Sequence, residues 1–425
     1  MVVLVHGTFF IYLFLCLIMA KRESAKIVCE LLINELQRLK NVKKKKRVWV
    51  RDWIKKRNTL GATNNICQEL SLEDQSSYRN FFRMDPSLHL YLLSKIKVAI
   101  QKEDTNMRLA IPAECKLNVT LRFLATGDSF SSLQYLFRIP KNTISTFIPE
   151  VLDAIYSALL DFLKVPNSVE EWKEIEKGFN EKWNFPGCIG AIDGKHVAIR
   201  APMFSGSEYY NYKNSFSIIL MAVVDANYCF RYIDIGAQGR HSDGGVFDHC
   251  SLRHMIEQNK LHIPENFVFV GDEAFPLKSY LMRPYPRREL NTDCKIFNYR
   301  LSRARRTVEN AFGILVSRFR VFEKPIATSV PTAVKIVKTA CALHNWLQTR
   351  RDSNYFSLGL IDKEDLEHYT FTPGSWREES KSNGLIQLQP LPPRFPDRSA
   401  RELRNYYCNY FNGVGAVPWQ NEIIR

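Results

Sequence analysis

The sequence predicts an α/β protein, α+β overall, in which an α-helical N-terminal region precedes a core built on a mixed sheet. Residues 48–165 are dominated by segments with apolar residues at helical spacing. After residue 185 come runs rich in Val, Ile and Phe, which are typical of strands. These runs give one strand, a two-stranded hairpin, a helix, another strand and another helix. That order predicts a mixed sheet with helices packed against it.

Four regions divide the chain. We expect an apolar N-terminal segment and a basic helical arm at 1–47, the helical region at 48–165, the core at 166–350 and a less regular tail at 351–425. Apolar residues at helical spacing predict a helix in the arm, within 26–46, and three helices in the helical region, at 86–100, 116–126 and 144–163. The tail combines a Pro-rich linker with a final short helix.

Part of the helical region has the sequence pattern of a helix-turn-helix. The segment "SSLQYLFRI" predicts a short helix, Pro140 ends it, and Asn142 is a suitable N-cap for a longer helix. Such a helix could enter a major groove. Two short helices with a polar turn also occur in helical bundles, and Pro149 inside the second helix counts against recognition, so DNA contact and plain packing both stay open.

The core begins with a recognisable helix start. Ser168 and Glu171 form a capping box, and the helix that follows places Trp172, Ile175, Phe179 and Trp183 on one face. The predicted strands are "CIGAIDGKHVAIRA", the hairpin "SFSIILMAVVDANYCFRYIDIGAQG" and "NFVFVGDEAF". In the hairpin, "DANY" is the turn, so Asp225 is expected to serve the turn. "DGGVFDHCSLRHMIEQ" and "SRARRTVENAFGILVSRFR" are predicted to be helical.

The charge of the chain indicates a polyanionic partner. The formal net charge is +15, and residues 1–60 hold fourteen Lys and Arg against four Asp and Glu, much of it in "KNVKKKKRVW". A second basic region, from Arg283 to Arg320, holds ten Lys and Arg against three acids. The first region is a candidate nuclear-import signal or DNA-contacting arm, and the alternative is a solvated run of charge.

The cysteines and the N-terminus favour different compartments. Ten cysteines are widely spaced, without a C-x-x-C pair or zinc-type Cys/His spacing, which is typical of reduced thiols in an intracellular protein. Residues 2–18, however, are uncharged and apolar, and Lys21 and Arg22 follow them, as in a signal anchor with a cytoplasmic body. The alternative, which we favour, is a soluble protein that starts at Met19.

Four acidic residues stand out by their positions. Asp193 lies in the middle of an apolar strand, Asp243 follows the third strand, Asp272 lies where the next strand ends, and Glu309 is on a helix. Adjacent strands and a helix packed across them can gather such carboxylates at one place. Carboxylates gathered in this way suit Mg²⁺ or Mn²⁺ and repel one another without a cation. Two such ions about 4 Å apart can activate a water and stabilise the leaving oxygen of a phosphodiester.

Each acid also has a simpler structural interpretation. An unpaired carboxylate in an apolar strand is costly, which favours a function for Asp193. Asp272 ends a strand, a usual place for sites in α/β sheets. Asp243 could instead cap the next helix, and Glu309 could pair with Arg305 one turn earlier. From the residues alone, Glu309 stays undecided.

Five ordered blocks give the chain a resemblance to a known superfamily. They are "GCIGAIDGKHVAIRAP", "YYNYKNSFSIILMAVVD", "GRHSDGGVF", "GDEAFPLKSYLMRPY", and "RRTVENAFGILVSRFRVF" followed by "ALHN". Together they cover about 185–347, and they resemble the PIF/Harbinger superfamily of transposases, most closely its transposase-derived nuclease branch of DDE superfamily endonucleases.

The resemblance implies a fold and a site. It implies an RNase H-like catalytic core in which Asp193, Asp272 and Glu309 form the catalytic acidic triad, with Asp243 as an additional acid in metal binding. It also implies Mg²⁺ or Mn²⁺ as the cofactor. No acid of these motifs is missing from the sequence.

Basic and aromatic residues near these acids then become candidates for DNA contact. The predicted phosphate contacts near Glu309 are Arg303, Arg305, Arg306, Arg318 and Arg320, and those near Asp193 are Lys195 and His196. An aromatic and basic loop that could stack on or steer DNA is formed by Tyr209, Tyr210, Tyr212 and Lys213. Ordinary packing stays open for each of them.

The resemblance also implies partners and a reaction. The expected partners are DNA, a Myb-like DNA-binding protein that the family often works with, and a second copy of this chain. The predicted function is that of a metal-dependent DNA endonuclease in the nucleus, and also in the cytoplasm, which cuts phosphodiesters by a two-metal mechanism with water or a 3′-hydroxyl as nucleophile. A DNA-binding regulator that does not cleave is the alternative. A membrane-anchored hydrolase, which rests only on residues 2–18, is the third.

Overall fold

The computed structural model describes most of the chain. The described residues are 13, 22–41, 50–106, 109–240, 243–286, 290–350, 355, 359–365, 368, 370–379, 385–387 and 397–423. Contacts divide the chain into two units, Met1–Asp52 and Trp53–Arg425. The first unit contains helix α2 (Arg22–Asn41), as the arm pattern predicts. The apolar segment 2–18, apart from Leu13, and the lysine-rich residues 42–49 lie outside the described residues.

The helical region is made of short and medium helices, as predicted. Their bounds are α3 (Asp52–Lys55), α4 (Arg57–Leu60), η1 (Ala62–Asn64), α5 (Ile66–Glu73), α6 (Gln75–Phe82), α7 (Pro86–Ile100), α8 (Ala113–Thr126), α9 (Phe130–Phe137), α10 (Lys141–Leu159) and η2 (Leu160–Phe162). α10 packs against α7, α8 and α15 (Val330–Thr349). Among the described helices, 141–162 is long and apolar enough to cross a membrane, and it supplies the core with Ile144, Ile148 and Leu152.

The two helices of the predicted helix-turn-helix are present, but the predicted cap is wrong. α10 begins at Lys141, one residue before Asn142, and Pro140 is its N-cap residue. The carbonyl of Pro140 accepts hydrogen bonds from the backbone N–H groups of Thr143 and Ile144. Proline is tolerated at this position because it lacks only a backbone N–H, a donor that the first turn of a helix does not need. Asn142 therefore lies within the first turn, where its own carbonyl accepts from the hydroxyls of Ser145 and Thr146.

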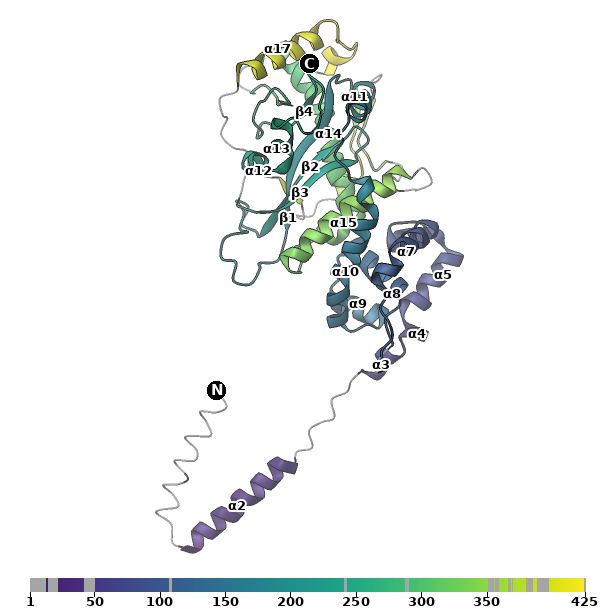
Figure 1. The fold of residues 1–425 in the computed structure, drawn as a ribbon, viewed down its shortest axis with the longest axis vertical. Helices are drawn as coiled ribbons and strands as arrows, with labels where there is room; N and C mark the ends of the chain where they lie inside the picture. Colours follow the sequence, from purple (N-terminus) through teal and green to yellow (C-terminus); the bar gives the residue numbers. More distant parts are fainter. Residues whose placement is uncertain are drawn as a thin grey trace. The chain divides into compact units, whose positions relative to one another are not determined.

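The core is a mixed sheet in the order β3-β2-β1-β4-β5 (Figure 1). The strands are β1 (Cys188–Ala198), β2 (Ser217–Val224), β3 (Phe230–Gln238), β4 (Val268–Val270) and β5 (Leu281–Met282). β2 is antiparallel to both of its neighbours, β1 and β3, whereas β4 is parallel to both of its neighbours, β1 and β5. β1 and β2 are buried almost throughout, which explains why both read as nearly continuous apolar runs.

Helices cover the sheet. The predicted capping box opens α11 (Val169–Trp183): the Ser168 hydroxyl accepts from the N–H of Glu171, and the Glu171 carboxylate accepts from Asn167. α11 packs on β1, α14 (Thr292–Arg318) on β1 and β2, and α15 on β3. In Figure 1, α12 (Asp243–His249) and α13 (Ser251–Glu257) lie on the other side of the sheet from α14 and α15.

Asn345 holds α15 to the sheet. It is fully buried, and its Oδ1 accepts from the N–H of Phe230 at 2.8 Å. Its Nδ2 donates to the carbonyls of Phe230, at 2.7 Å, and Phe162, at 2.9 Å. One amide therefore satisfies three backbone groups of β3 and η2. The nearby Asp225 accepts from Asn227 and Cys229 in the hairpin turn, as predicted.

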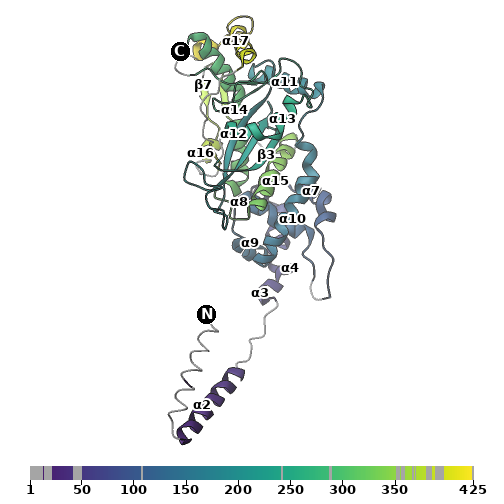
Figure 2. The same cartoon turned by 60° about the vertical axis from the view of Figure 1, so that its left-hand side comes forward.

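The tail contributes more to the core than its composition suggested. Its elements are β6 (Lys363–Asp365), β7 (Thr370–Thr372), α16 (Trp376–Glu379), β8 (Leu385–Gln387), α17 (Arg398–Asn412) and α18 (Gln420–Ile423). β8 pairs with β1. α17 packs on α14, and both helices are labelled in Figure 2. The buried Arg300 of α14 donates to the carbonyl of Asn184 and to the side chain of Gln420, and desolvation by burial lowers its pKa to about 10. The nine cysteines of the described part are free thiols.

Candidate active site

Asp193 is held in the middle of the sheet. It lies in β1, opposite Ala222 of β2, and only 2% of its surface is exposed. A buried carboxylate is costly unless it is paired. The ammonium of Lys195, two residues along the same strand, lies 2.8 Å from Asp193 Oδ2 and supplies that pairing. The strand thus fixes both the carboxylate and its counter-charge on the same face.

Asp272 reaches the same place from the neighbouring strand. β1 and β4 are parallel and match Ala191 with Val270, so Asp193 and Asp272 each lie two residues beyond a matched pair. Residues in register on parallel strands project to the same side of a sheet. The Gln387 amide nitrogen confirms the proximity, because it lies 3.3 Å from Asp193 Oδ1 and 3.5 Å from Asp272 Oδ2.

The proximity of the two carboxylates changes the acidity of Asp272. Burial and the charge of Asp193 raise the pKa of Asp272, while Arg305 and the N–H of Ala274 act in the opposite direction. A cation placed between the two carboxylates would relieve the repulsion that contributes to this rise.

Glu309 joins the site through Arg305. Both are on α14, one turn apart, and they form the ion pair that their spacing predicts. The same guanidinium reaches Asp272, with Nη1 3.8 Å from Oδ2. Burial alone would lower the pKa of Arg305, but the carboxylates of Glu309, Asp193 and Asp272 together raise it. Arg305 is therefore the electrostatic link between the helix and the two strands.

The fourth acid is only partly located. Asp243 is the first residue of α12, and its side chain lies outside the part of the chain that the structure describes. The metal-binding role predicted for Asp243 therefore stays a prediction.

The donor set suits a hard divalent cation. Among the described residues, no group of three or more His, Cys, Asp or Glu side chains is arranged as a metal cluster. Instead, the carboxylates of this site form ion pairs with Lys195 and Arg305. Carboxylate oxygens that repel one another are the donors that Mg²⁺ or Mn²⁺ prefers, and the metal-binding role of Asp193, Asp272 and Glu309 stays a prediction.

Of the predicted DNA contacts beside Asp193, one is inside the protein. His196 is fully buried, and its Nδ1 lies 2.9 Å from the hydroxyl of Ser217. Burial and Lys213 lower the pKa of His196 to about 4, so its imidazole is neutral at pH 7. Tyr212 and Lys213 of the neighbouring loop are exposed.

The arginines of α14 are mostly engaged within the protein. Arg303 is buried, with Nε 2.7 Å from Glu364 Oε2 and Nη1 2.7 Å from Asn184 Oδ1. Arg306 lies 3.5 Å from the same Glu364 carboxylate. Nothing in these placements tests DNA contact, which stays a prediction for the residues proposed for it, among them Lys195, His196, Lys213, Arg303, Arg305 and Arg306.

Sequence reasoning missed two residues of the tail. Glu364 of β6 pairs with the α14 arginines, and Gln387 of β8 contacts both strand carboxylates. Each lies in a strand of three residues, which is too short for an alternation to be recognised.

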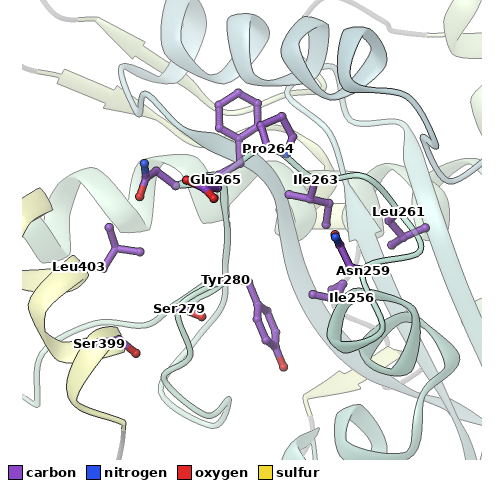
Figure 3. Close-up of a pocket in the computed structure, with 12 residues that line it drawn as sticks. Ile256, Asn259, Leu261, Ile263, Pro264, Glu265, Ser279, Tyr280, Ser399 and Leu403 are labelled. Carbon is purple, nitrogen blue, oxygen red and sulfur yellow. The ribbon is translucent and has the colours of Figure 1, made fainter.

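Two of the pockets in the core differ in position, since one lies beside the acidic residues and the other away from them. One, of about 260 Å³, is lined by Asp272, Glu273, Pro284, Tyr285, Asn298, Leu301, Ser302 and Arg305, so it opens beside the carboxylates. Another, of about 390 Å³, lies between α13, the segment before β4 and α17, with Tyr280 projecting into it (Figure 3). The described residues that line this second pocket include none of Asp193, Asp272 and Glu309.

Replacing Asp272 by asparagine is expected to raise the melting temperature of the metal-free protein at pH 7, by about 1–3 °C. Because the pKa of Asp272 is raised by folding, the stability associated with its protonated form is lost as the pH rises through the folded pKa. Asparagine resembles the protonated form and avoids this loss. The difference from wild type should shrink as the pH falls toward 4. Thermal melting in a chelator at several pH values measures it.

Asp234→Asn on β3 is the control for that experiment, since it removes a strand carboxylate outside the site. A lower melting temperature for Asp272→Asn than for wild type at pH 7 would contradict the expectation.

Comparisons with known proteins identify a family for part of the chain. Residues 192–345 match the family described as DDE superfamily endonuclease. The chain is 24% identical over 315 residues to Protein ALP1-like of Arabidopsis thaliana, covering 69% of this chain and 76% of that protein. It is 24% identical over 263 residues to "Putative nuclease HARBI1" of Mus musculus, covering 61% and 74%. No solved structure matches the chain.

The matched region contains Asp193, Asp272 and Glu309, together with β1 from residue 192 onward, β2 to β5, α14 and most of α15. DDE endonuclease domains have an RNase H-like fold, in agreement with the mixed sheet. Residues 192–345 therefore carry a DDE superfamily endonuclease domain, and the chain is similar to Harbinger transposase-derived proteins.

Proposed function

We propose that the chain is a metal-dependent DNA endonuclease that cuts phosphodiester bonds at the site formed by Asp193, Asp272 and Glu309. The observation that carries the proposal is that Asp193 of β1 and Asp272, two residues after β4, both lie within 3.5 Å of the Gln387 amide nitrogen, with Glu309 joined to Asp272 through Arg305. A structural role explains one buried ion pair. It does not explain why two strands place carboxylates side by side, where they repel each other.

The residues have distinct roles in this proposal. Asp193 and Asp272, fixed by strands, and Glu309, on the helix, hold divalent cations. When bound, two such ions activate a nucleophile and stabilise the leaving oxygen of the phosphodiester. The nucleophile is water in hydrolysis or a 3′-hydroxyl in strand transfer. Arg305, which pairs with Glu309 and lines the pocket beside Asp272, would contact a phosphate oxygen of a substrate bound there.

DNA is the substrate that the charge of the chain favours. The net charge of +15 attracts a polyanion, and Lys213 and Tyr212 are exposed on a loop before β2. We place the protein in the nucleus, on the lysine-rich run at 40–47. A Myb-like protein and a second copy of this chain are the proposed partners.

The test is cleavage of supercoiled plasmid and of end-labelled duplexes by the purified chain. We expect nicked and linear products with Mg²⁺ or Mn²⁺, and no products when a chelator is added. The assay uses many duplex sequences and a high protein concentration, so that cleavage depends less on a partner that recruits the protein to DNA. Absence of metal-dependent products from every substrate would contradict the proposal.

A DNA-binding regulator that does not cleave is the second candidate. One observation favours it: Lys195, Arg305 and Gln387 already engage the carboxylates, so these have partners without a metal. In that case the chain would shift duplex DNA in a gel, with or without Mn²⁺, and would leave it intact.

A further inference from the structure

The tail strand β8 lies at one edge of β1 together with β4. β2 pairs along the other edge, from Ala191 to Ala198. On the shared edge, β4 pairs with 188–191 and β8 pairs with 195–197, so the two strands follow each other along β1. Asp193 lies level with the gap between them. The acidic site is therefore located where two partners of one strand meet.

Gln387 spans this gap. It is the residue of β8 that pairs with Lys195, and its side chain reaches back to the carboxylates. Its Nε2 lies 3.3 Å from Asp193 Oδ1 and 3.5 Å from Asp272 Oδ2, and its Oε1 accepts from Lys195 Nζ. Its backbone carbonyl accepts from the hydroxyl of Tyr212 at 2.7 Å. All of these contacts are to residues of the site or of the adjacent loop.

An amide N–H₂ between two carboxylates fills the role of a cation. It offers two donors to oxygens that would otherwise repel each other, and these are the same oxygens that a divalent ion requires. Together, Gln387, Lys195 and Arg305 satisfy the acidic site in the metal-free protein.

We propose that β8 is an internal competitor for the divalent cation, so that cation binding and docking of β8 on β1 exclude each other through Gln387. The proposal rests on the proposed function, because it concerns the regulation of the same site. Gln387 is exposed and β8 has only three residues, so few bonds must break for β8 to leave. Its departure would free the edge of β1 at 195–197 and the hydroxyl of Tyr212, next to the exposed Lys213.

The first test is the affinity of the full chain for Mn²⁺, measured by calorimetry in the absence of DNA. Gln387→Ala is expected to bind Mn²⁺ about tenfold more tightly than wild type, since hydrogen bonds from a neutral donor to carboxylates no longer compete. Gln348→Ala is the matched control. It removes a glutamine amide bond from α15 to Asn227 and should leave the affinity unchanged. Equal or weaker Mn²⁺ binding by Gln387→Ala, or no binding by either protein, overturns the proposal.

The second test locks β8 in place and leaves Gln387 intact. Val197 and Leu385 are paired across the two strands, so cysteines at both positions are placed for a disulfide. The oxidised double variant should bind Mn²⁺ at least about tenfold more weakly than its reduced form. Val197→Cys and Leu385→Cys alone should show no such dependence on oxidation. An affinity that is the same in both redox states contradicts the exclusion.

These outcomes separate the competitor from the proposed nuclease. If Mn²⁺ binds as expected in both tests and no DNA is cut, the competition stands and the nuclease fails. If the protein cuts DNA with Mn²⁺ while Gln387→Ala and the locked form bind Mn²⁺ like wild type, the nuclease stands and the competition fails.

Discussion

Replacement of Asp193 by asparagine is expected to reduce the rate of metal-dependent DNA cleavage at least about 10³-fold. Asparagine keeps the shape of the side chain and one oxygen but removes the charge that a divalent ion requires. Asp193 is buried in the middle of β1, so the strand fixes the position of its carboxylate. The variant also leaves the ammonium of Lys195 without its carboxylate partner, which places a positive charge where a cation should bind. Single-turnover cleavage of a labelled duplex in Mn²⁺ measures the effect.

The control for Asp193→Asn is again Asp234→Asn on β3, which changes a strand carboxylate outside the acidic site. Its rate should stay close to that of wild type. Melting curves of both variants separate loss of chemistry from loss of folding. Cleavage by Asp193→Asn at the wild-type rate would show that any nuclease activity in the preparation arises elsewhere.

Replacement of Asn345 by leucine is expected to lower the free energy of unfolding by about 4 kcal/mol. Leucine has a similar volume, but it leaves the N–H and carbonyl of Phe230 and the carbonyl of Phe162 without the partner they have now. Each buried polar group without a partner costs about 1–3 kcal/mol. Urea unfolding followed by tryptophan fluorescence measures the change. The "ALHN" block is thus explained by a structural role for its asparagine.

A change of less than about 1 kcal/mol for Asn345→Leu would mean that water or a shifted backbone satisfies these groups. Gln348→Ala serves as the control here too, because it lies one turn later on the same helix and at the surface. It should alter the free energy of unfolding by less than about 0.5 kcal/mol.

Elements with a long and strong pattern were predictable from the sequence. The helix expected at 86–100 is α7 with the same bounds, and the apolar run around Asp193 is β1. The helix start at Asn142 was wrong, because capping preference ranks side chains and takes no account of a proline that already shapes the turn. Local rules therefore identify elements better than they identify their ends.

The acidic site was predictable only in part. The pairing of Asp193 with Asp272 depends on strands of one sheet, and the strand pattern around each residue is clear in the sequence. The contribution of Gln387 was not predictable, because β8 is a strand only by virtue of its pairing with β1. A three-residue segment has no periodicity of its own. Its partner strand is also distant in the sequence, since 192 residues separate Lys195 from Gln387.

The buried guanidinium of Arg300 has a consequence for the order in which the protein matures during synthesis. Its partners are Asn184 on one side and Gly415 and Gln420 on the other, and it stacks on the ring of Phe411. Until the ribosome releases α17 and the residues after it, this charge lacks half of its partners and α14 cannot settle fully against the sheet. Since α14 carries Arg305 and Glu309, a nascent chain should complete the acidic site only after the tail has emerged.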